Sequence, residues 1–312
     1  MNIPRRASAK PDLVIVNGEI VPFGQATISI MAPGFTFAVC VFEGLRAYWN
    51  AEHEQLYVFR LAEHLERLQF SMRLIELDPP PTSAELTTQV IKLLQANHCR
   101  ADTYIRVQAY VDDWGEMMAT GPVSSSVICR DRPRVAEFES GKHFVVSSWR
   151  RNADDASPPR IKATANYLNS RLAGLEARRA DGSAAIILNR NGTVSEGPGG
   201  CLFFVRDGCL ITPPVTAGIL ESQTRETLLE LARDLGLENA VRDIGRTELY
   251  LASEGFYCGT GQEIVPILSI DRKPLGDGKP GALTRQLQTA YDDAVRARSE
   301  RYRHWTSAVY EQ

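Results

Sequence analysis

Tight turns between short β-rich runs are the feature that most constrains how this chain folds. Leu13–Val16 (LVIV) is followed by Asn17-Gly18 and by a second β-rich run at Glu19–Val21. Asn-Gly tolerates the positive φ angles that a two-residue hairpin turn requires, so this segment predicts two antiparallel strands. Arg190–Gly192 and Arg206–Gly208 are further turn signals of this kind. We therefore expect sheets that are substantially antiparallel.

Hydrophobic periodicity predicts the other elements. A helix is indicated over Glu63–Ile75, and a capping box at Thr82–Glu85 begins a second helix. Thr103–Val111 alternates as a strand does, which places the side chains of Tyr104 and Arg106 on one face. The remaining predicted strands are His143–Trp149, Ala184–Asn189, Cys201–Val205 and Cys209–Ile211, and the remaining helices are Ala165–Arg179, Thr224–Leu235 and the stretch after Pro280.

The order of these elements indicates the fold class. Strands and helices do not alternate in strict βαβ order, which favours α+β domains over a Rossmann fold. With 312 residues the chain is long enough for two domains. The polar stretch between Cys129 and His143 contains Pro and Gly and predicts a linker. We predict an N-terminal α/β domain over residues 1–134 and a larger C-terminal domain over residues 135–312.

Composition excludes several functional classes. The formal net charge of −3 shows no excess of basic residues of the kind that nucleic acid or an anionic membrane selects. No apolar run approaches the ~20 residues that span a bilayer, and the N-terminus does not resemble a signal peptide. The six cysteines form no CxxC pair and the five histidines are scattered. We expect reduced thiols, no metal site and a cytoplasmic location.

Lys162 lies in a segment, Pro159–Tyr167, whose only other charged residue is Arg160. Most lysines are solvated surface residues, and spacing alone favours that interpretation here. The functional alternative is a lysine with limited solvation, which has a lowered pKa and can attack a carbonyl to form a Schiff base.

Glu196 follows the turn at Arg190–Gly192 and is flanked by glycines. Alone, it is most simply a polar turn residue. A carboxylate in such a place can instead pair with a pyridinium nitrogen and tune a cofactor. Leu220–Arg225 runs into a predicted helix, and Cys258–Gln262 forms a turn with the Thr260 hydroxyl. Both segments resemble phosphate-binding sites, although most helix starts bind nothing.

Taken together, these segments resemble the class IV (fold type IV) aminotransferases that use pyridoxal 5'-phosphate (PLP), and among them the branched-chain amino acid aminotransferases most closely. The resemblance covers nearly the whole chain, and it implies that the C-terminal domain holds a pseudo-barrel of largely antiparallel strands. Its markers are Val41–Tyr48 (VFEGLRAY), Phe59-Arg60, Glu63-His64, Arg67-Leu68, Tyr104–Arg106, Ser147–Trp149, Lys162, Asn166-Tyr167, Ser195–Gly197, Thr224-Arg225, Gly259-Thr260 and Glu263-Ile264.

The resemblance implies roles for particular residues. Lys162 matches the Schiff-base lysine, which also moves the proton between the substrate Cα and the cofactor C4′. Glu196 matches the partner of the pyridine nitrogen, and Tyr167 matches the hydroxyl that binds the phenolate oxygen. The phosphate cradle would comprise Arg67, Gln223, Thr224 and Thr260, with Leu220 against the ring. The substrate site would comprise Tyr104, Arg106, the Thr260-Gly261 turn and Arg46 as a further carboxylate contact.

The sequence also departs from the branched-chain pattern. Phe37 stands where those enzymes usually carry an aromatic hydroxyl near the substrate, and Ser222-Gln223 replaces a small residue and an aliphatic one before Thr224. Pro198–Cys201 is also unusual for the family. The expected reaction is amino transfer to a 2-oxo acid from a branched-chain amino acid or from a more specialised donor.

Other functions remain open from the sequence. A PLP lyase of the aminodeoxychorismate type would use the same lysine and glutamate, and a D-amino-acid or (R)-amine aminotransferase would differ in pocket geometry. A non-catalytic protein of the same fold would not need Lys162, Glu196, Arg67 and Thr260 together. The resemblance further implies a homodimer whose site lies between the two domains and is closed in part by a partner loop, for which Asp112–Pro122 is the candidate segment.

Overall fold

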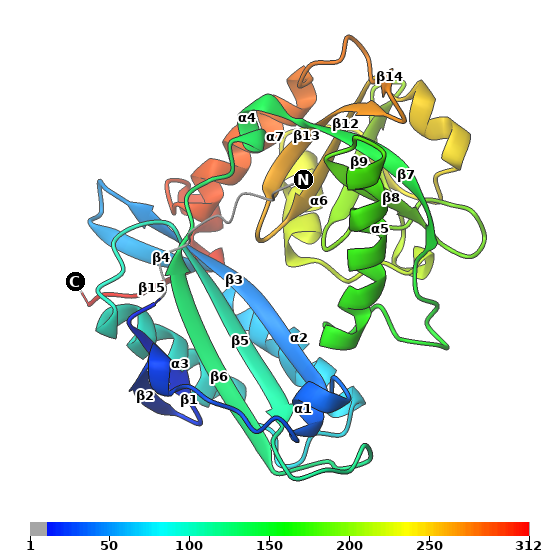
Figure 1. Ribbon diagram of the computed structural model, residues 1–312. Helices are drawn as coiled ribbons and strands as arrows, with labels where there is room; N and C mark the ends of the chain where they lie inside the picture. Colours follow the sequence, from blue (N-terminus) through cyan, green and yellow to red (C-terminus); the bar gives the residue numbers. More distant parts are fainter. Residues whose placement is uncertain (1–10, 312) are drawn as a thin grey trace. The chain divides into compact units, whose positions relative to one another are not determined.

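The computed structural model describes residues 11–311 and divides into two compact units (Figure 1). Unit 1 contains the described residues up to Pro133 and the stretch from Val295 onward, and unit 2 is Arg134–Ala294. The division falls inside the predicted linker. The C-terminal stretch, which the sequence prediction placed in the second domain, groups with unit 1. Residues 1–10, where no signal peptide is predicted, lie outside the described part.

Unit 1 contains a seven-stranded sheet in the order β15-β4-β3-β5-β6-β1-β2, and each pair of neighbours is antiparallel. Its strands are β1 (Leu13–Val16), β2 (Glu19–Pro22), β3 (Cys40–Asn50), β4 (Gln55–Phe59), β5 (Thr103–Val111), β6 (Val123–Asp131) and β15 (Thr306–Ala308). The predicted hairpin is confirmed, with positive φ angles of 51° at Asn17 and 84° at Gly18.

Helices α2 (Leu61–Leu74) and α3 (Ser83–Ala96) pack against this sheet (Figure 1). The predicted capping box is present, because the Thr82 hydroxyl accepts from the Glu85 N–H and the Glu85 carboxylate accepts from the Thr82 N–H. The short helices of unit 1 are α1 (Pro33–Thr36), η1 (Phe23–Gln25) and η5 (Glu300–Trp305).

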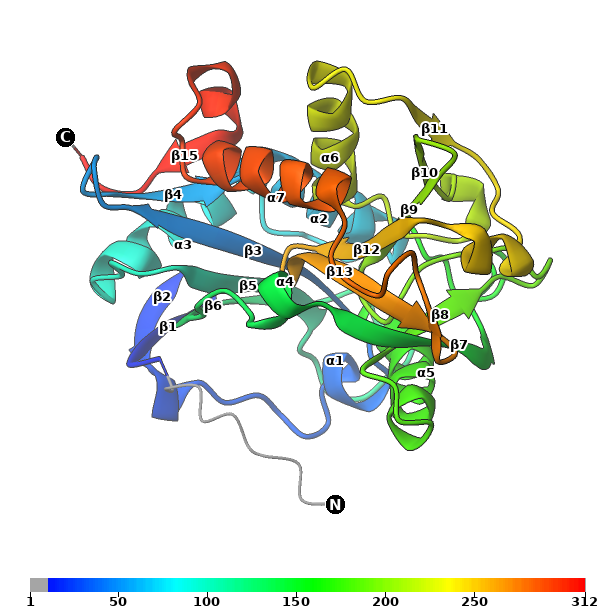
Figure 2. The same cartoon turned by 90° about the horizontal axis from the view of Figure 1, so that it is seen from above.

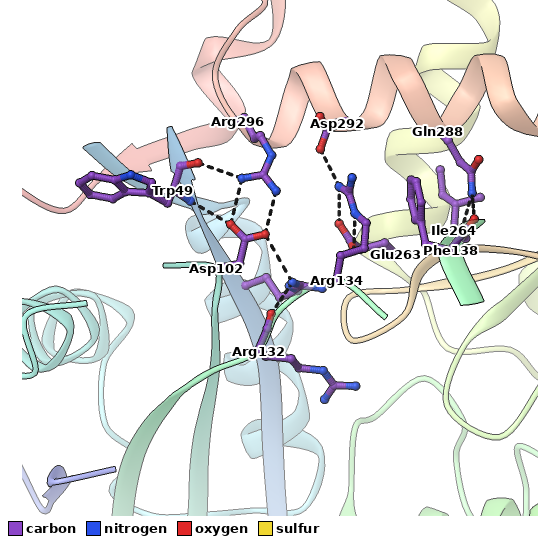
Figure 3. Close-up of polar contacts among 11 residues, drawn as sticks. Trp49, Asp102, Arg132, Arg134, Phe138, Glu263, Ile264, Gln288, Asp292 and Arg296 are labelled. Carbon is purple, nitrogen blue, oxygen red and sulfur yellow. Dashed lines mark hydrogen bonds and ion pairs between the residues drawn. The ribbon is translucent and has the colours of Figure 1, made fainter. Parts of the chain in front are cut away.

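A largely buried ion pair fixes the C-terminal stretch within unit 1. Arg296 donates from both terminal nitrogens to Asp102, at 2.9 and 2.7 Å, and also to the Trp49 carbonyl at 2.8 Å (Figure 3). Gln55 donates to the Tyr310 carbonyl at 2.7 Å. These contacts join residues far apart in the sequence, which is why the linear pattern did not assign this stretch to unit 1.

Unit 2 contains a mixed sheet in the order β11-β10-β9-β12-β13-β7-β8, with β14 paired to β13. The strands are β7 (Lys142–Arg150), β8 (Ala184–Leu188), β9 (Cys201–Arg206), β10 (Cys209–Thr212), β11 (Asn239–Val241), β12 (Glu254–Gly259), β13 (Glu263–Ile270) and β14 (Lys273–Pro274). The central pairs are antiparallel, and the outer pairs β10–β11, β13–β7 and β7–β8 are parallel.

The helices of unit 2 are α4 (Glu137–Ser140), α5 (Tyr167–Arg179), α6 (Gln223–Asp234) and α7 (Ala282–Val295), with short turns η2 (Thr164–Asn166), η3 (Val215–Ala217) and η4 (Arg246–Leu251). Helix α5 packs on β7 and β8 through its small residues Ala173 and Ala177 (Figure 2). Because α5 joins two parallel strands, β7-α5-β8 is one crossover unit within a sheet whose centre is antiparallel.

No helix within residues 11–311 is both long and apolar enough to cross a membrane. Within the same residues, no group of His, Cys, Asp and Glu side chains has the arrangement of a metal site.

Candidate active site

Lys162 lies in unit 2 between β7 and α5, and a buried asparagine fixes the backbone before it. Asn166 donates from Nδ2 to the carbonyls of Pro158 and Ile161, at 2.9 and 3.2 Å, and accepts at Oδ1 from Asn152 at 3.0 Å. The Lys162 Nζ is 5.8 Å from the centre of the Tyr167 ring. The segment therefore holds a half-buried amine beside a tyrosine.

Glu196 is buried and paired with an arginine. The Arg151 Nη2 lies 2.7 Å from Glu196 Oε1, and both side chains are almost fully buried. The backbone N–H of Leu220 donates to Oε2 at 3.2 Å. Burial raises the pKa of Glu196, while the charges of Arg151 and Lys162 and the Leu220 N–H oppose that rise. An ionised Glu196 therefore depends on the guanidinium beside it.

The glycine-rich segment after Glu196 lies against the end of β12. A methyl group at Gly200 would lie 2.4 Å from the Cys258 carbonyl oxygen, so only glycine fits this approach. A methyl group at Gly199, where φ is +104°, would lie 3.8 Å from the Tyr167 ring. The Gly199-Gly200 backbone thus lies close to Tyr167 and to Gly259, next to Thr260.

Helix α6 begins close to Glu196. Its first turn is capped by Ser222, whose hydroxyl accepts from the Arg225 N–H at 3.4 Å. The N–H of Leu220, two residues before Ser222, donates to Glu196. Gln223 and Thr224, the first residues of α6, therefore come soon after this contact in the chain. The Arg225 side chain bonds to Thr212 and to the Pro213 carbonyl. The N–H groups of the first turn and the helix dipole give this end a partial positive charge.

A hollow of about 530 Å³ connects some of these parts. Its lining includes Tyr167, Pro198, Tyr257 and Gln262, and therefore reaches from α5 to the turn that contains Thr260 and Gly261. Other contacts bring Lys162, Tyr167, Glu196 and the turn together, because Lys162 lies beside Tyr167 and its charge acts on Glu196, and the Gly199-Gly200 backbone approaches Gly259.

In unit 1, Tyr104 and Arg106 lie on one face of the sheet, as predicted. Arg106 is paired with Gly44 of β3, and Tyr104 is paired with Arg46. A methyl group at Gly44 would lie 2.5 Å from the Tyr104 hydroxyl, so the glycine makes room for that hydroxyl. The Arg106 guanidinium stacks 4.0 Å from the centre of the Phe42 ring, and its buried Nε has no hydrogen-bond partner among the described residues. The predicted substrate role of Tyr104 and Arg106 stays a prediction.

Arg67 of α2 forms a buried ion cluster with β3. It donates from Nε and Nη2 to the two oxygens of Glu43, at 2.7 and 2.8 Å, and Glu43 also contacts His64 Nδ1 at 2.7 Å. Burial acts to raise the pKa of Glu43, but the charges and hydrogen bonds of Arg67 and His64 outweigh it and hold the pKa far below its usual value. The predicted phosphate role of Arg67 stays a prediction.

The two other predicted substrate residues differ in exposure. Arg46 is 1% exposed, donates to the Arg132 carbonyl at 2.7 Å and lies 3.8 Å from Asp102. It therefore has protein partners of its own, and its role as a carboxylate contact stays a prediction. Phe37 follows α1 and is 47% exposed, so its ring is available to a ligand or to another surface.

Sequence reasoning missed Arg151, the partner of Glu196. A buried carboxylate needs a cation nearby, so the sequence could have predicted that some basic residue meets Glu196. It could not predict which one, because Arg151 is the second of two adjacent arginines and lies far from Glu196 in the chain.

Comparisons with known proteins show the family of this chain. The family described as amino-transferase class IV matches residues 40–270. A probable branched-chain-amino-acid aminotransferase from Aquifex aeolicus is 38% identical over 304 residues, which covers 96% of this chain and 97% of the relative.

Solved structures are similar over almost the full length. The branched-chain amino acid aminotransferase from Thermobaculum terrenum, in its PLP form, is 42% identical with a TM-score of 0.91, covering 97% of this chain and 99% of that one. The branched-chain aminotransferase from Thermoproteus uzoniensis, solved with norvaline, is 38% identical with a TM-score of 0.90, covering 96% and 99%.

The chain belongs to the class IV aminotransferases. It has fold type IV and is a PLP-dependent transaminase, which confirms the main prediction. The main prediction is favoured over the lyase, the D-amino-acid or (R)-amine aminotransferase and the non-catalytic protein, because the similar proteins are branched-chain aminotransferases over nearly their whole length.

Proposed function

We propose that PLP is bound covalently by Lys162 and that the enzyme transfers the amino group of a branched-chain L-amino acid, or of a more specialised donor, to a 2-oxo acid. The observation that carries this proposal is the grouping in unit 2 of a half-buried amine, a tyrosine and a buried carboxylate held by Arg151. These are the chemical groups that a pyridine aldehyde phosphate requires: an amine for the aldehyde, a donor for the phenolate and a carboxylate for the protonated ring nitrogen.

The remaining residues of unit 2 fit the phosphate. The first turn of α6 offers the N–H groups of Gln223 and Thr224 together with the Thr224 hydroxyl. Thr260 adds a hydroxyl, and Leu220 supplies an apolar contact for the ring. PLP, when bound, supplies a protonated ring that makes the α-hydrogen of an attached amino acid acidic.

The protein residues direct the proton and the substrate. The Lys162 amine would take the proton from the substrate Cα and return it at the C4′ position of the cofactor. Glu196 keeps the ring nitrogen protonated, and this requires the carboxylate to be ionised, which Arg151 favours. We assign the substrate carboxylate to Tyr104, Arg106 and the Thr260-Gly261 turn, with Arg46 and Phe37 as further substrate contacts and Arg67 as a phosphate contact.

The names of the relatives support the proposed substrate class. Those named above are branched-chain aminotransferases, and the Thermoproteus uzoniensis protein was solved with norvaline, an amino acid with an apolar side chain. Exposed Phe37 cannot donate the hydrogen bond that a tyrosine would, which leaves room for a donor other than leucine, isoleucine or valine.

The test is to identify the lysine that binds PLP by reducing the bond between them. Borohydride reduction of the PLP-loaded protein should fix the cofactor on the peptide that contains Lys162. Lys162→Ala should fold, leave no PLP attached after reduction and lose at least ~10³-fold of the amino-transfer rate. Lys273→Ala, an exposed lysine on β14, serves as the control and should behave as the parent does. Reduced PLP on another lysine, or near-parental turnover by Lys162→Ala, would refute the assignment.

We further propose that the enzyme is a cytoplasmic homodimer in which Asp112–Pro122 contacts the partner. Within this segment Trp114 is 79% exposed and Met118 is 81% exposed, and side chains of this kind favour a protein contact. Sedimentation equilibrium should give twice the mass of one chain, and a monomeric mass would refute the dimer.

A further inference from the structure

The turn between β12 and β13 contains a residue in an unfavourable backbone conformation. Gly259 ends β12, Glu263 begins β13, and the Gln262 N–H donates to the Gly259 carbonyl at 2.9 Å. Glu263 has φ of +57°, although it is not a glycine. A left-handed conformation is unfavourable for such a residue, and it persists only where the surroundings determine it strongly.

An arginine from the start of unit 2 binds the side chain of that residue. Arg134 donates from Nε and Nη2 to the two oxygens of Glu263, at 3.0 and 2.9 Å (Figure 3). The Glu263 side chain is fully buried, whereas that of Arg134 is 25% exposed. The Arg134 Nη2 also contacts Asp292 of α7 at 2.6 Å. This paired geometry fixes orientation as well as distance.

Charge keeps this contact intact. Partial burial acts to lower the pKa of Arg134, but the hydrogen bonds and charges of Glu263 and Asp292 outweigh it and raise the pKa above its usual value. If Arg134 were removed, the buried Glu263 carboxylate would lose two hydrogen bonds and the charge of this guanidinium, and such a loss is costly in the interior of a protein. A glycine at position 263 would adopt the positive φ angle more easily. The glutamate side chain is therefore explained by its contact with Arg134 and not by the backbone conformation.

Side chains from β7 and α7 contact the residues after Gly261 at two further points. Lys142 donates to Gln262 Oε1 at 3.1 Å. Gln288 of α7 donates to the carbonyls of Phe138 and Ile264, at 2.6 and 3.0 Å (Figure 3). Three side chains therefore fix the residues that directly follow Thr260 and Gly261.

We propose that Arg134 is a positioning residue for the Thr260-Gly261 turn, and that its paired contact with Glu263 holds the turn in the shape that binds the substrate carboxylate and the cofactor phosphate. The identity of the groups that the turn binds, the substrate carboxylate and the cofactor phosphate, rests on the proposed function. The mechanical part of the proposal is that Arg134 fixes the conformation of the turn, and this part does not depend on the proposed function.

The mechanical part is tested by amide hydrogen exchange on the holoenzyme. Arg134→Met should speed the exchange of the amides of residues 260–264 by about tenfold or more. Arg134→Lys keeps the charge but cannot make the paired contact with Glu263, so its exchange rates should lie between those of the parent and of Arg134→Met. It replaces Arg134→Met if that variant does not fold. The matched control is Arg242→Met, because Arg242 also donates to both carboxylate oxygens of one glutamate, Glu248, but follows edge strand β11, which is separated from β13 by three strands. The control should leave exchange in the turn unchanged.

The ligand part is tested by comparing two amino donors. L-leucine carries a carboxylate, and 3-methylbutylamine is the same molecule without it. In Arg134→Met the half-saturating concentration of leucine should rise about tenfold with a smaller change in the limiting rate, while that of the amine stays constant. PLP should also bind more weakly. Glu263→Gly should show the same changes even though it relieves the backbone strain.

Two results would overturn the proposal. One is parental exchange of the turn amides in Arg134→Met, and the other is an equal change for leucine and for the amine. If the parent enzyme reacts with neither donor, the proposed substrate class fails, and the exchange experiment still decides whether Arg134 positions the turn.

Discussion

At the scale of single residues, the Arg151–Glu196 pair decides the protonation state of the site. The two side chains are 2.7 Å apart and almost fully buried. Burial raises the pKa of Glu196, and the guanidinium opposes that rise. The useful state of Glu196 is the ionised one, which exists at a pH above its pKa in the folded protein.

Replacing Arg151 should therefore shift the pH dependence. In Arg151→Met the pKa of Glu196 should rise further, so that the protonated form dominates near neutral pH and the amino-transfer rate falls about tenfold or more. The rate should recover as the pH increases and Glu196 loses its proton. Arg151→Lys, which keeps the charge, should retain most of the activity. Stopped-flow rates against pH would check this, and a lower rate with an unchanged profile would show that Arg151 acts in another way.

At the scale of secondary structure, local patterns predicted many elements. The β1–β2 hairpin and the start of α3 were predicted because a turn and a cap are made by neighbouring residues. Strand β3 was recognised only as a family motif. Almost all of its residues are buried, so its sequence lacks the alternation that indicates a half-exposed strand.

Strand β3 and helix α2 are joined by Glu43, His64 and Arg67, and this contact makes stability depend on pH. The folded pKa of Glu43 is depressed, and the usual value is 4.5. The stabilisation is complete above the usual value. It is lost as the pH falls, because the unfolded chain then binds a proton that the folded chain does not.

Glu43→Gln should remove this dependence. The variant should be less stable near neutral pH, by ~3–5 kcal/mol, because Arg67 and His64 lose a buried anion. As the pH falls below about 4.5, however, its stability should decrease less steeply than that of the parent. Urea unfolding at several pH values would measure both effects. Parallel curves for the two proteins would show that Glu43 is not the titrating group.

At the scale of the whole chain, the site residues come from segments that the sequence separates widely. In unit 2, Lys162 precedes α5, Glu196 follows β8, Leu220 precedes α6 and Thr260 follows β12. The family motifs predict these residues as parts of the proposed site. Their supporting partners, Arg151 and Arg134, could not be predicted, because only the sheet order brings them to Glu196 and Glu263.

The boundary between the two units was also only partly predictable from the sequence. The polar linker was predicted from composition, and the division falls within it. The grouping of the C-terminal stretch with unit 1 depends on Arg296, Asp102 and Gln55, which are distant in the sequence. Such long-range contacts leave no periodic signal.

The most direct measurement is the near-ultraviolet and visible absorbance spectrum of the purified PLP-loaded protein before and after L-leucine is added. We predict that the band of lysine-bound PLP is lost and that the band of pyridoxamine phosphate grows in its place. A PLP band that leucine leaves unaltered would contradict the branched-chain substrate and direct the search to other donors. The absence of any such band after PLP is supplied would contradict the central claim that Lys162 carries the cofactor.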